Sequence, residues 1–164
     1  MRILGIDPGK ATGFAIYDTD TLSFTHMEES GDGIYGFKPV FQKLFGQVFN
    51  DPYKVTHMVC EGFTLRGSNE FTANLQGVEI IGWLKGEGLW GLHNPEPSQH
   101  MQLTRLRKNK DKYQDSVITK TMQRDKYKIG KGHTRMAGSV AVWFAAKRLY
   151  HEPTLELLKP KDEK

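Results

Sequence analysis

The segment Arg2–Asp7 constrains the fold more than any other part of the chain. It reads RILGID, an almost unbroken apolar run closed by a carboxylate, and Pro8-Gly9 stops it. Strands without alternating polar residues are typical of sheets that are covered on both faces. Proline ends such a strand because it lacks the N–H donor of the ladder. The segment therefore predicts a central strand in a sheet of the α/β class.

The rest of the chain predicts a mixed five-stranded sheet flanked by helices, in the order βββαβαβα. Apolar runs predict the other strands, and apolar residues at helical spacing predict the helices. We expect further strands at Gly13–Tyr17, Leu22–Glu28, Val55–Glu61 and Leu89–Leu92, and helices at Ile34–Asn50, Glu70–Lys85 and His133–Tyr150. These elements predict one domain over residues 1–150. Pro153 should end any helix, which leaves residues 151–164 as a polar tail.

Within the helix expected at Glu70–Lys85, we predict one buried face. Apolar residues recur there at helical spacing, at Leu75, Val78, Ile81 and Leu84.

Composition excludes several classes of protein. The 164 residues are 38% hydrophobic and 26% charged, which is a globular balance. No apolar run approaches the roughly 20 residues that a membrane helix needs, and the N-terminus does not resemble a signal peptide. Cys60 is the single cysteine, so no intramolecular disulfide forms. We therefore expect no membrane and a reducing compartment.

The charge distribution is uneven and favours a polyanionic partner. Residues 1–104 carry 7 basic and 12 acidic side chains, whereas residues 105–131 carry 10 basic and 3 acidic ones. An acidic body beside one basic segment is typical of nucleic-acid binding, although a solvated loop has the same composition. We expect residues 105–132 to form a mobile insertion. The candidate phosphate contacts are Arg66, Arg105, Arg107, Lys108, Lys110 and Lys112.

Two carboxylates end predicted interior strands. Asp7 closes the first strand and Glu61 closes the strand Val55–Glu61. If these strands are neighbours, the like charges repel at one sheet edge, and Mg²⁺ relieves that repulsion. His133 opens the last helix, and an imidazole there is suited to metal binding or to general-base catalysis. The alternatives are a turn role for Asp7 and a surface position for His133.

The residues around these carboxylates resemble a known family. Gly5-Ile6-Asp7-Pro8-Gly9 with Thr12-Gly13-Phe14-Ala15 resembles the first motif of the RuvC-type Holliday junction resolvases, and Val59-Cys60-Glu61-Gly62-Phe63 resembles the second. The resemblance spans roughly residues 1–150, and the size is similar to a phage-encoded branch. It implies an RNase H-like fold.

The third motif departs from the family pattern. The family's final helix opens with His or Asp and carries an aspartate three residues later, but here His133 is followed by Met136. A thioether does not replace a carboxylate on Mg²⁺. Three readings remain: His133 suffices with the two carboxylates, Asp115 or Asp125 substitutes, or the site is impaired.

The resemblance also implies an activity, which is metal-dependent cleavage of four-way or other branched DNA by a homodimer. Two Mg²⁺ or Mn²⁺ ions would be bridged by Asp7, with Glu61 on one ion and His133 on the other; one ion activates water and the other stabilises the leaving 3′ oxygen. The alternatives are a structure-selective DNA-binding protein without catalysis, and a nuclease for flaps or RNA–DNA hybrids. The Asp-x-Gly opening also resembles the phosphate loop of actin-type ATPases, but their two domains need a longer chain, so we expect no nucleotide cofactor.

Overall fold

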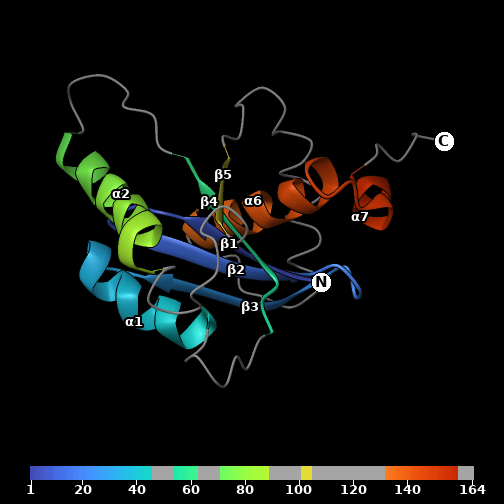
Figure 1. Ribbon diagram of the computed structural model, residues 1–164, viewed down its shortest axis with the longest axis horizontal. Coiled ribbons are helices and arrows are strands. Elements are labelled where there is room, and N and C mark those ends of the chain that lie inside the picture. Colours follow the sequence, from blue (N-terminus) through green and yellow to red (C-terminus); the bar gives the residue numbers. More distant parts are fainter. Residues whose placement is uncertain (46–53, 63–70, 89–100, 105–131, 159–164) are drawn as a thin grey trace.

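A mixed sheet forms the centre of the molecule in the computed structural model, which describes residues 1–45, 54–62, 71–88, 101–104 and 132–158 (Figure 1). The strand order is β3-β2-β1-β4-β5. The first three strands form an antiparallel meander, and β1 then pairs in parallel with β4 and β4 with β5. The strands are β1 (Arg2–Asp7), β2 (Thr12–Asp18), β3 (Ser23–Ser30), β4 (His57–Glu61) and β5 (Met101–Thr104).

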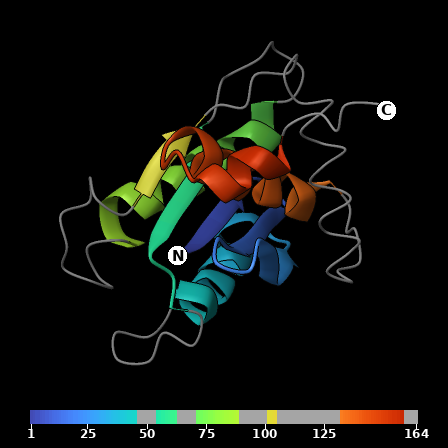
Figure 2. The ribbon, with the colours of Figure 1, turned by 90° about the vertical axis from the view of Figure 1, so that its right-hand side faces the viewer.

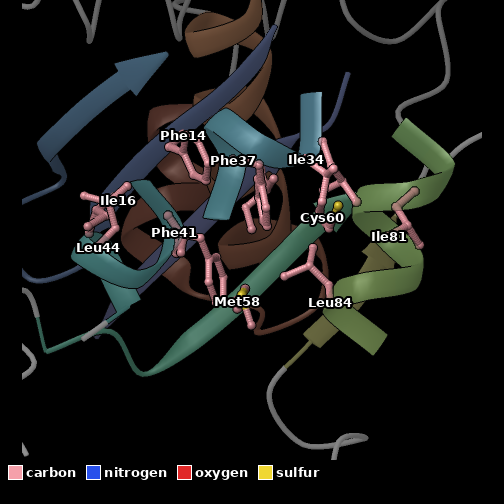
Figure 3. Close-up of a cluster of buried hydrophobic side chains, with 13 residues drawn as sticks. Phe14, Ile16, Ile34, Phe37, Phe41, Leu44, Met58, Cys60, Ile81 and Leu84 are labelled. Atoms are coloured by element: carbon pink, nitrogen blue, oxygen red, sulfur yellow. The ribbon is translucent and has the colours of Figure 1, made fainter. Parts of the chain in front are cut away.

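Helices cover both faces of β1, as its sequence predicts. On one face lie α1 (Gly33–Phe45) and α2 (Phe71–Trp83), which continues into a π-helical turn at Leu84–Gly88; on the other lies α6 (His133–Lys147) (Figures 1 and 2). Successive side chains of a strand point to opposite faces. Leu4 and Ile6 therefore join the core on the α1 side, and Ile3 joins the core beneath α6. Figure 3 shows the first of these cores, in which Phe37 and Phe41 lie near Phe14 and Met58.

The buried face of α2 differs from the prediction. Leu75 and Val78 were expected inside but are 48% and 44% exposed. The buried stripe consists of Gly77, Ile80, Ile81 and Leu84. Both sets fall at helical spacing, so periodicity did not distinguish them. The face that packs against α1 and the sheet was decided by tertiary contacts.

The last strand lies in a different segment from the one expected. The strand predicted at Leu89–Leu92 falls outside the described residues, whereas Met101–Thr104 pairs with β4. The basic segment 105–131 also falls outside the described residues, so its expected mobility stays a prediction.

The prediction that Pro153 ends helical structure is wrong. Residues Glu152–Leu157 form a further helix, α7, with the proline in its first turn. An N–H is not used at that position, so proline is tolerated there. The His151 side chain caps the helix, and the hydroxyls of Tyr17 and Thr154 form a buried hydrogen bond of 3.2 Å. Residues 152–157 are therefore packed on the domain and are not part of a polar tail.

Asp18, at the end of β2, gives the fold a dependence on pH. Its carboxylate is buried and accepts a 3.0 Å hydrogen bond from Arg2 Nε. Burial alone would raise the pKa of Asp18, but the hydrogen bonds from Arg2 and from the Asp20 backbone N–H outweigh it and hold the pKa below its ordinary value. Asp18 therefore stabilises the fold above about pH 4, and this contribution is lost as the pH falls through the depressed pKa.

We expect Asp18→Asn to lower the free energy of unfolding at neutral pH, and the difference from wild type to shrink as the pH falls below about 4. Urea unfolding at a series of pH values measures this difference. A difference that stays constant down to pH 2 would show that the Asp18 charge does not contribute.

Among the described residues, no helix has the length and apolar character needed to cross a bilayer.

Candidate active site

Two carboxylates meet where β1 and β4 end. The strands pair in parallel with Gly5 opposite Val59 and Ile6 opposite Cys60, so the next residue on each is Asp7 and Glu61. Alternation along a strand puts these two side chains on the same face as Val59, the face that α6 covers. The two strand ends therefore lie side by side, and interaction with the Glu61 side chain lowers the pKa of Asp7.

The first turn of α6 brings His133 to the same edge. Its Nδ1 lies 2.8 Å from Oδ2 of Asp7, with 45% of the histidine side chain exposed and 16% of the aspartate. Two glycines allow this close approach. A Cβ atom on Gly13 would collide with the carbonyl oxygen of His133, and one on Gly5 would collide with that of Ala137. The glycines of the two central strands thus fix the height of the helix over the sheet.

The environment of Asp7 opposes its negative charge. Burial, the largest effect, raises its pKa; the hydrogen bonds from His133 and Glu61 lower it, and the charge of Glu29 raises it again, with a net upward shift. A desolvated carboxylate that is close to another acidic side chain is stabilised by a cation. The site therefore has negative charge that the protein does not fully balance.

Cys60 has no part in this site. Its side chain belongs to the core on the α1 side of the sheet. Burial raises the pKa of the thiol far above its ordinary value, and the charges of Asp7 and Glu61 add to the increase. The thiol stays protonated, so it is neither a nucleophile nor a metal ligand.

The donor types at this edge fit a hard divalent cation. Carboxylate oxygens are the ligands that Mg²⁺ prefers, and imidazole binds Mn²⁺ as well. The side chains contact one another directly, and within the described ranges no three His, Cys, Asp or Glu side chains form a preassembled metal-binding group. The donor types, together with the uncompensated charge on Asp7, support binding of a divalent cation at this edge.

Several residues singled out in the sequence are not described. Among them are the two carboxylates proposed as substitutes, Asp115 and Asp125, and all the candidate phosphate contacts: Arg66, Arg105, Arg107, Lys108, Lys110 and Lys112. Met136 is described and lies half-buried on α6, one turn after His133. Sequence reasoning missed Glu29, whose charge acts on Asp7. The available signal was that the third strand also carries two glutamates, Glu28 and Glu29, next to its last residue.

Gly13→Ala should damage both the fold and the site. The added methyl group meets the backbone of α6, and overpacking of this kind costs about 1–3 kcal/mol. Urea unfolding measures the loss, and Gly31→Ala is the control, because a Cβ there meets nothing within 4 Å. Equal stabilities for Gly13→Ala and Gly31→Ala would contradict the close packing of α6 on β2.

Comparison with known proteins gives a likeness of fold. No family model and no curated protein matches the sequence. Among solved structures, the chain is similar to T. thermophilus RuvC in complex with a Holliday junction substrate, with a TM-score of 0.58 and 11% sequence identity. The match covers 90% of this chain and 96% of that one. At this identity the likeness shows only that the chain shares the fold of that structure.

Proposed function

We propose that this protein is a metal-dependent endonuclease that resolves four-way (Holliday) or other branched DNA junctions by phosphodiester hydrolysis. The observation that carries the proposal is the meeting of Asp7 and Glu61 with His133 at one sheet edge. The RuvC-like fold supports it, because the similar structure is bound to a Holliday junction. The size is similar to that of a phage-encoded branch, and the single cysteine favours a reducing compartment; we therefore propose a phage-like protein that acts in bacterial or infected-host cytoplasm.

The proposed cofactor is Mg²⁺ or Mn²⁺, with two ions in each site. Asp7 would be shared between them, Glu61 would hold one and His133 the other. When bound, the ions would supply an activated water and charge neutralisation at the leaving 3′ oxygen. The chain itself fixes the donors: β1 and β4 hold the two carboxylates side by side, and α6 orients the imidazole through its contact with Asp7.

Branched DNA is the proposed substrate because basic residues follow the ends of β4 and β5 in the sequence. Arg66 comes shortly after Glu61 and the remaining candidates follow β5; together they are Arg66, Arg105, Arg107, Lys108, Lys110 and Lys112. Lysine and arginine side chains bind the phosphates that flank a cleavage site without reading sequence.

We propose a homodimer, so that one molecule presents two sites to a four-way junction. One candidate for this contact is the helix expected at Glu70–Lys85, because its small residues Gly77, Gly82 and Gly86 would allow close approach. Gly77 is buried within the protomer and does not contribute to an outer face. Leu75 and Val78 are exposed apolar residues on the same helix as the exposed Gly82, and these three make the better candidate surface.

Cleavage of synthetic DNA tests the proposal. We expect nicks in four-way or three-way junctions with Mg²⁺ or Mn²⁺, and none in linear duplex of the same sequence or in the presence of EDTA. Cleavage of flaps or RNA–DNA hybrids in place of junctions would assign the chain to another class of RNase H-like nuclease. Cleavage independent of a divalent metal would contradict the proposal.

A second function, structure-selective DNA binding without catalysis, is favoured by Met136. This apolar side chain occupies the position one turn after His133, where a further carboxylate would complete the family pattern. Junction binding with no cleavage at any metal concentration would support this alternative.

A further inference from the structure

The loop that joins β1 to β2 starts directly after Asp7 and carries Lys10. It consists of residues 8–11, between the last residue of β1 and the first residue of β2. Consecutive Cα atoms are about 3.8 Å apart, so the Cα atoms of Asp7 and Lys10 lie within roughly 11 Å of each other. Lys10 therefore belongs to the sheet edge where Asp7 and Glu61 lie next to His133.

Hydrogen bonds fix the backbone of this loop on both sides. The Gly9 N–H donates to Thr12 Oγ1 at 3.2 Å, and the Thr12 hydroxyl donates to the Gly9 carbonyl oxygen at 3.2 Å. The Lys10 carbonyl oxygen accepts a 2.9 Å hydrogen bond from the N–H of Gly33, at the start of α1. Thr12 is buried at the beginning of β2. The backbone that carries the Lys10 side chain is therefore held to β2 and to α1.

The Lys10 side chain itself has no role in holding the fold together. Lys10 is exposed, and its ammonium group makes no hydrogen bond or ion pair with the residues that the structure describes. Lys43 shows the contrast, because its Nζ lies 2.7 Å from Oε2 of Glu28. A fixed backbone with a free ammonium group is suited to binding an anion that approaches the site.

The place of Lys10 in the sheet complements that of the other basic residues. In the strand order β3-β2-β1-β4-β5, the loop that carries Lys10 lies on the β2 side of Asp7. The phosphate contacts proposed for the basic segment follow β4 and β5 in the sequence, and these two strands lie on the other side of β1. Lys10 thus supplies a cation on the side of Asp7 away from β4 and β5.

We propose that Lys10 binds a backbone phosphate of the DNA strand on the β2 side of the bond that is cut. The inference rests on the proposed function. One strand of DNA advances about 3.4 Å per nucleotide, so a residue within roughly 11 Å of Asp7 is suited to a phosphate about three nucleotides or fewer from that bond. The contact offsets the repulsion between the DNA and the carboxylates of the site, and it reads no base sequence.

Fluorescence anisotropy of the full chain with a labelled four-way junction in EDTA tests the inference. We expect Lys10→Gln to weaken binding by about 5-fold and to reduce the slope of log affinity against log salt by about one, since one phosphate contact is lost. Lys54→Gln is the matched control, because Lys54 is also exposed but precedes β4 at the opposite end of the sheet. It should keep the wild-type slope. Equal slopes for Lys10→Gln and Lys54→Gln would overturn the inference.

A conservative variant and thermal unfolding separate a phosphate contact from damage to the loop. Arginine keeps the positive charge, so Lys10→Arg should retain the wild-type salt slope. Lys10→Gln should unfold at the wild-type temperature, because the side chain is exposed and the loop is held through the backbone of this residue. Weaker binding by both variants, together with a lower unfolding temperature, would show that residue 10 acts through the loop structure and would contradict the proposed contact.

Cleavage kinetics distinguish failure of this inference from failure of the proposed function. With Mg²⁺ or Mn²⁺, Lys10→Gln should raise KM for the junction more than it lowers kcat, because the phosphate contact is made before and during the reaction. If wild type neither binds nor cleaves branched DNA, both proposals are wrong. If wild type does both and Lys10→Gln matches it in salt slope and in KM, the proposed function stands and the role of Lys10 alone is wrong.

Discussion

Replacing Asp7 with asparagine should abolish metal-dependent cleavage of a four-way junction while leaving binding of the junction intact. We expect the rate to fall by at least about 1000-fold, which corresponds to about 4 kcal/mol of transition-state stabilisation. The physical reason is that Asp7 lies between the other two candidate ligands: His133 approaches it to 2.8 Å, and Glu61 ends the neighbouring parallel strand. An amide lacks the charge that two cations would share. Single-turnover cleavage and a gel-shift measurement on the same junction give the two quantities.

Asp20→Asn is the matched control for this variant. Asp20 is exposed at the opposite end of the sheet and lies 3.1 Å from the N-terminal amine. It should cleave and bind as wild type does. Because the net effect of the protein on Asp7 is to disfavour its charge, Asp7→Asn should also fold at least as well as wild type. Cleavage by Asp7→Asn at the wild-type rate would remove the basis of the proposed function.

Neutralising the basic segment should give the second large effect, on binding. We expect the triple variant Arg105→Gln, Arg107→Gln and Lys108→Gln to weaken junction binding by about 10-fold or more at moderate salt, since hydrogen bonds to charged groups contribute about 1.5–3 kcal/mol each. Each lost phosphate contact should also reduce the slope of log affinity against log salt by about one. Fluorescence anisotropy across a salt series measures both.

A control with the same change in net charge separates specific contacts from the overall field of the protein. Lys54, Lys147 and Arg148 are exposed and lie away from the candidate site, before β4 and at the far end of α6. Changing these three residues to glutamine should leave the salt slope close to that of wild type. Equal slopes for the two triple variants would show that the basic segment makes no phosphate contacts of its own.

Part of the candidate site could be predicted from local sequence because strands have a simple geometry. An apolar run that ends in Asp7, and another that ends in Glu61, place each carboxylate at the end of its own buried strand whatever the rest of the chain does. The pairing of these strands in parallel then brings the two ends to one edge. His133 was identified as the first residue of a helix, and this position too depends on local pattern.

Features that depend on contacts between distant segments of the chain could not be predicted from local sequence. Leu75 and Val78 follow the same spacing as the residues that α2 buries, so the outward face was not distinguishable before the packing was known. Local sequence predicts that Pro153 ends a helix. The segment after it is nevertheless helical because it packs on the domain, where Thr154 forms a hydrogen bond with Tyr17. The strand Met101–Thr104 lacked a marked apolar pattern, and its pairing with β4 defines it.

The amino-acid sequence alone determined the class of fold and the two strands whose ends carry carboxylates, because the apolar pattern of a strand or helix is a property of a short stretch of sequence. The tertiary structure decided which side chains meet. The contact of His133 with Asp7 spans 126 positions of the chain, and the alignment of Glu29 with Asp7 depends on the register of two ladders through Gly13. Register and the position of α6 over the sheet are set by packing over the whole domain, and Gly5 and Gly13 allow α6 to lie close to β1 and β2.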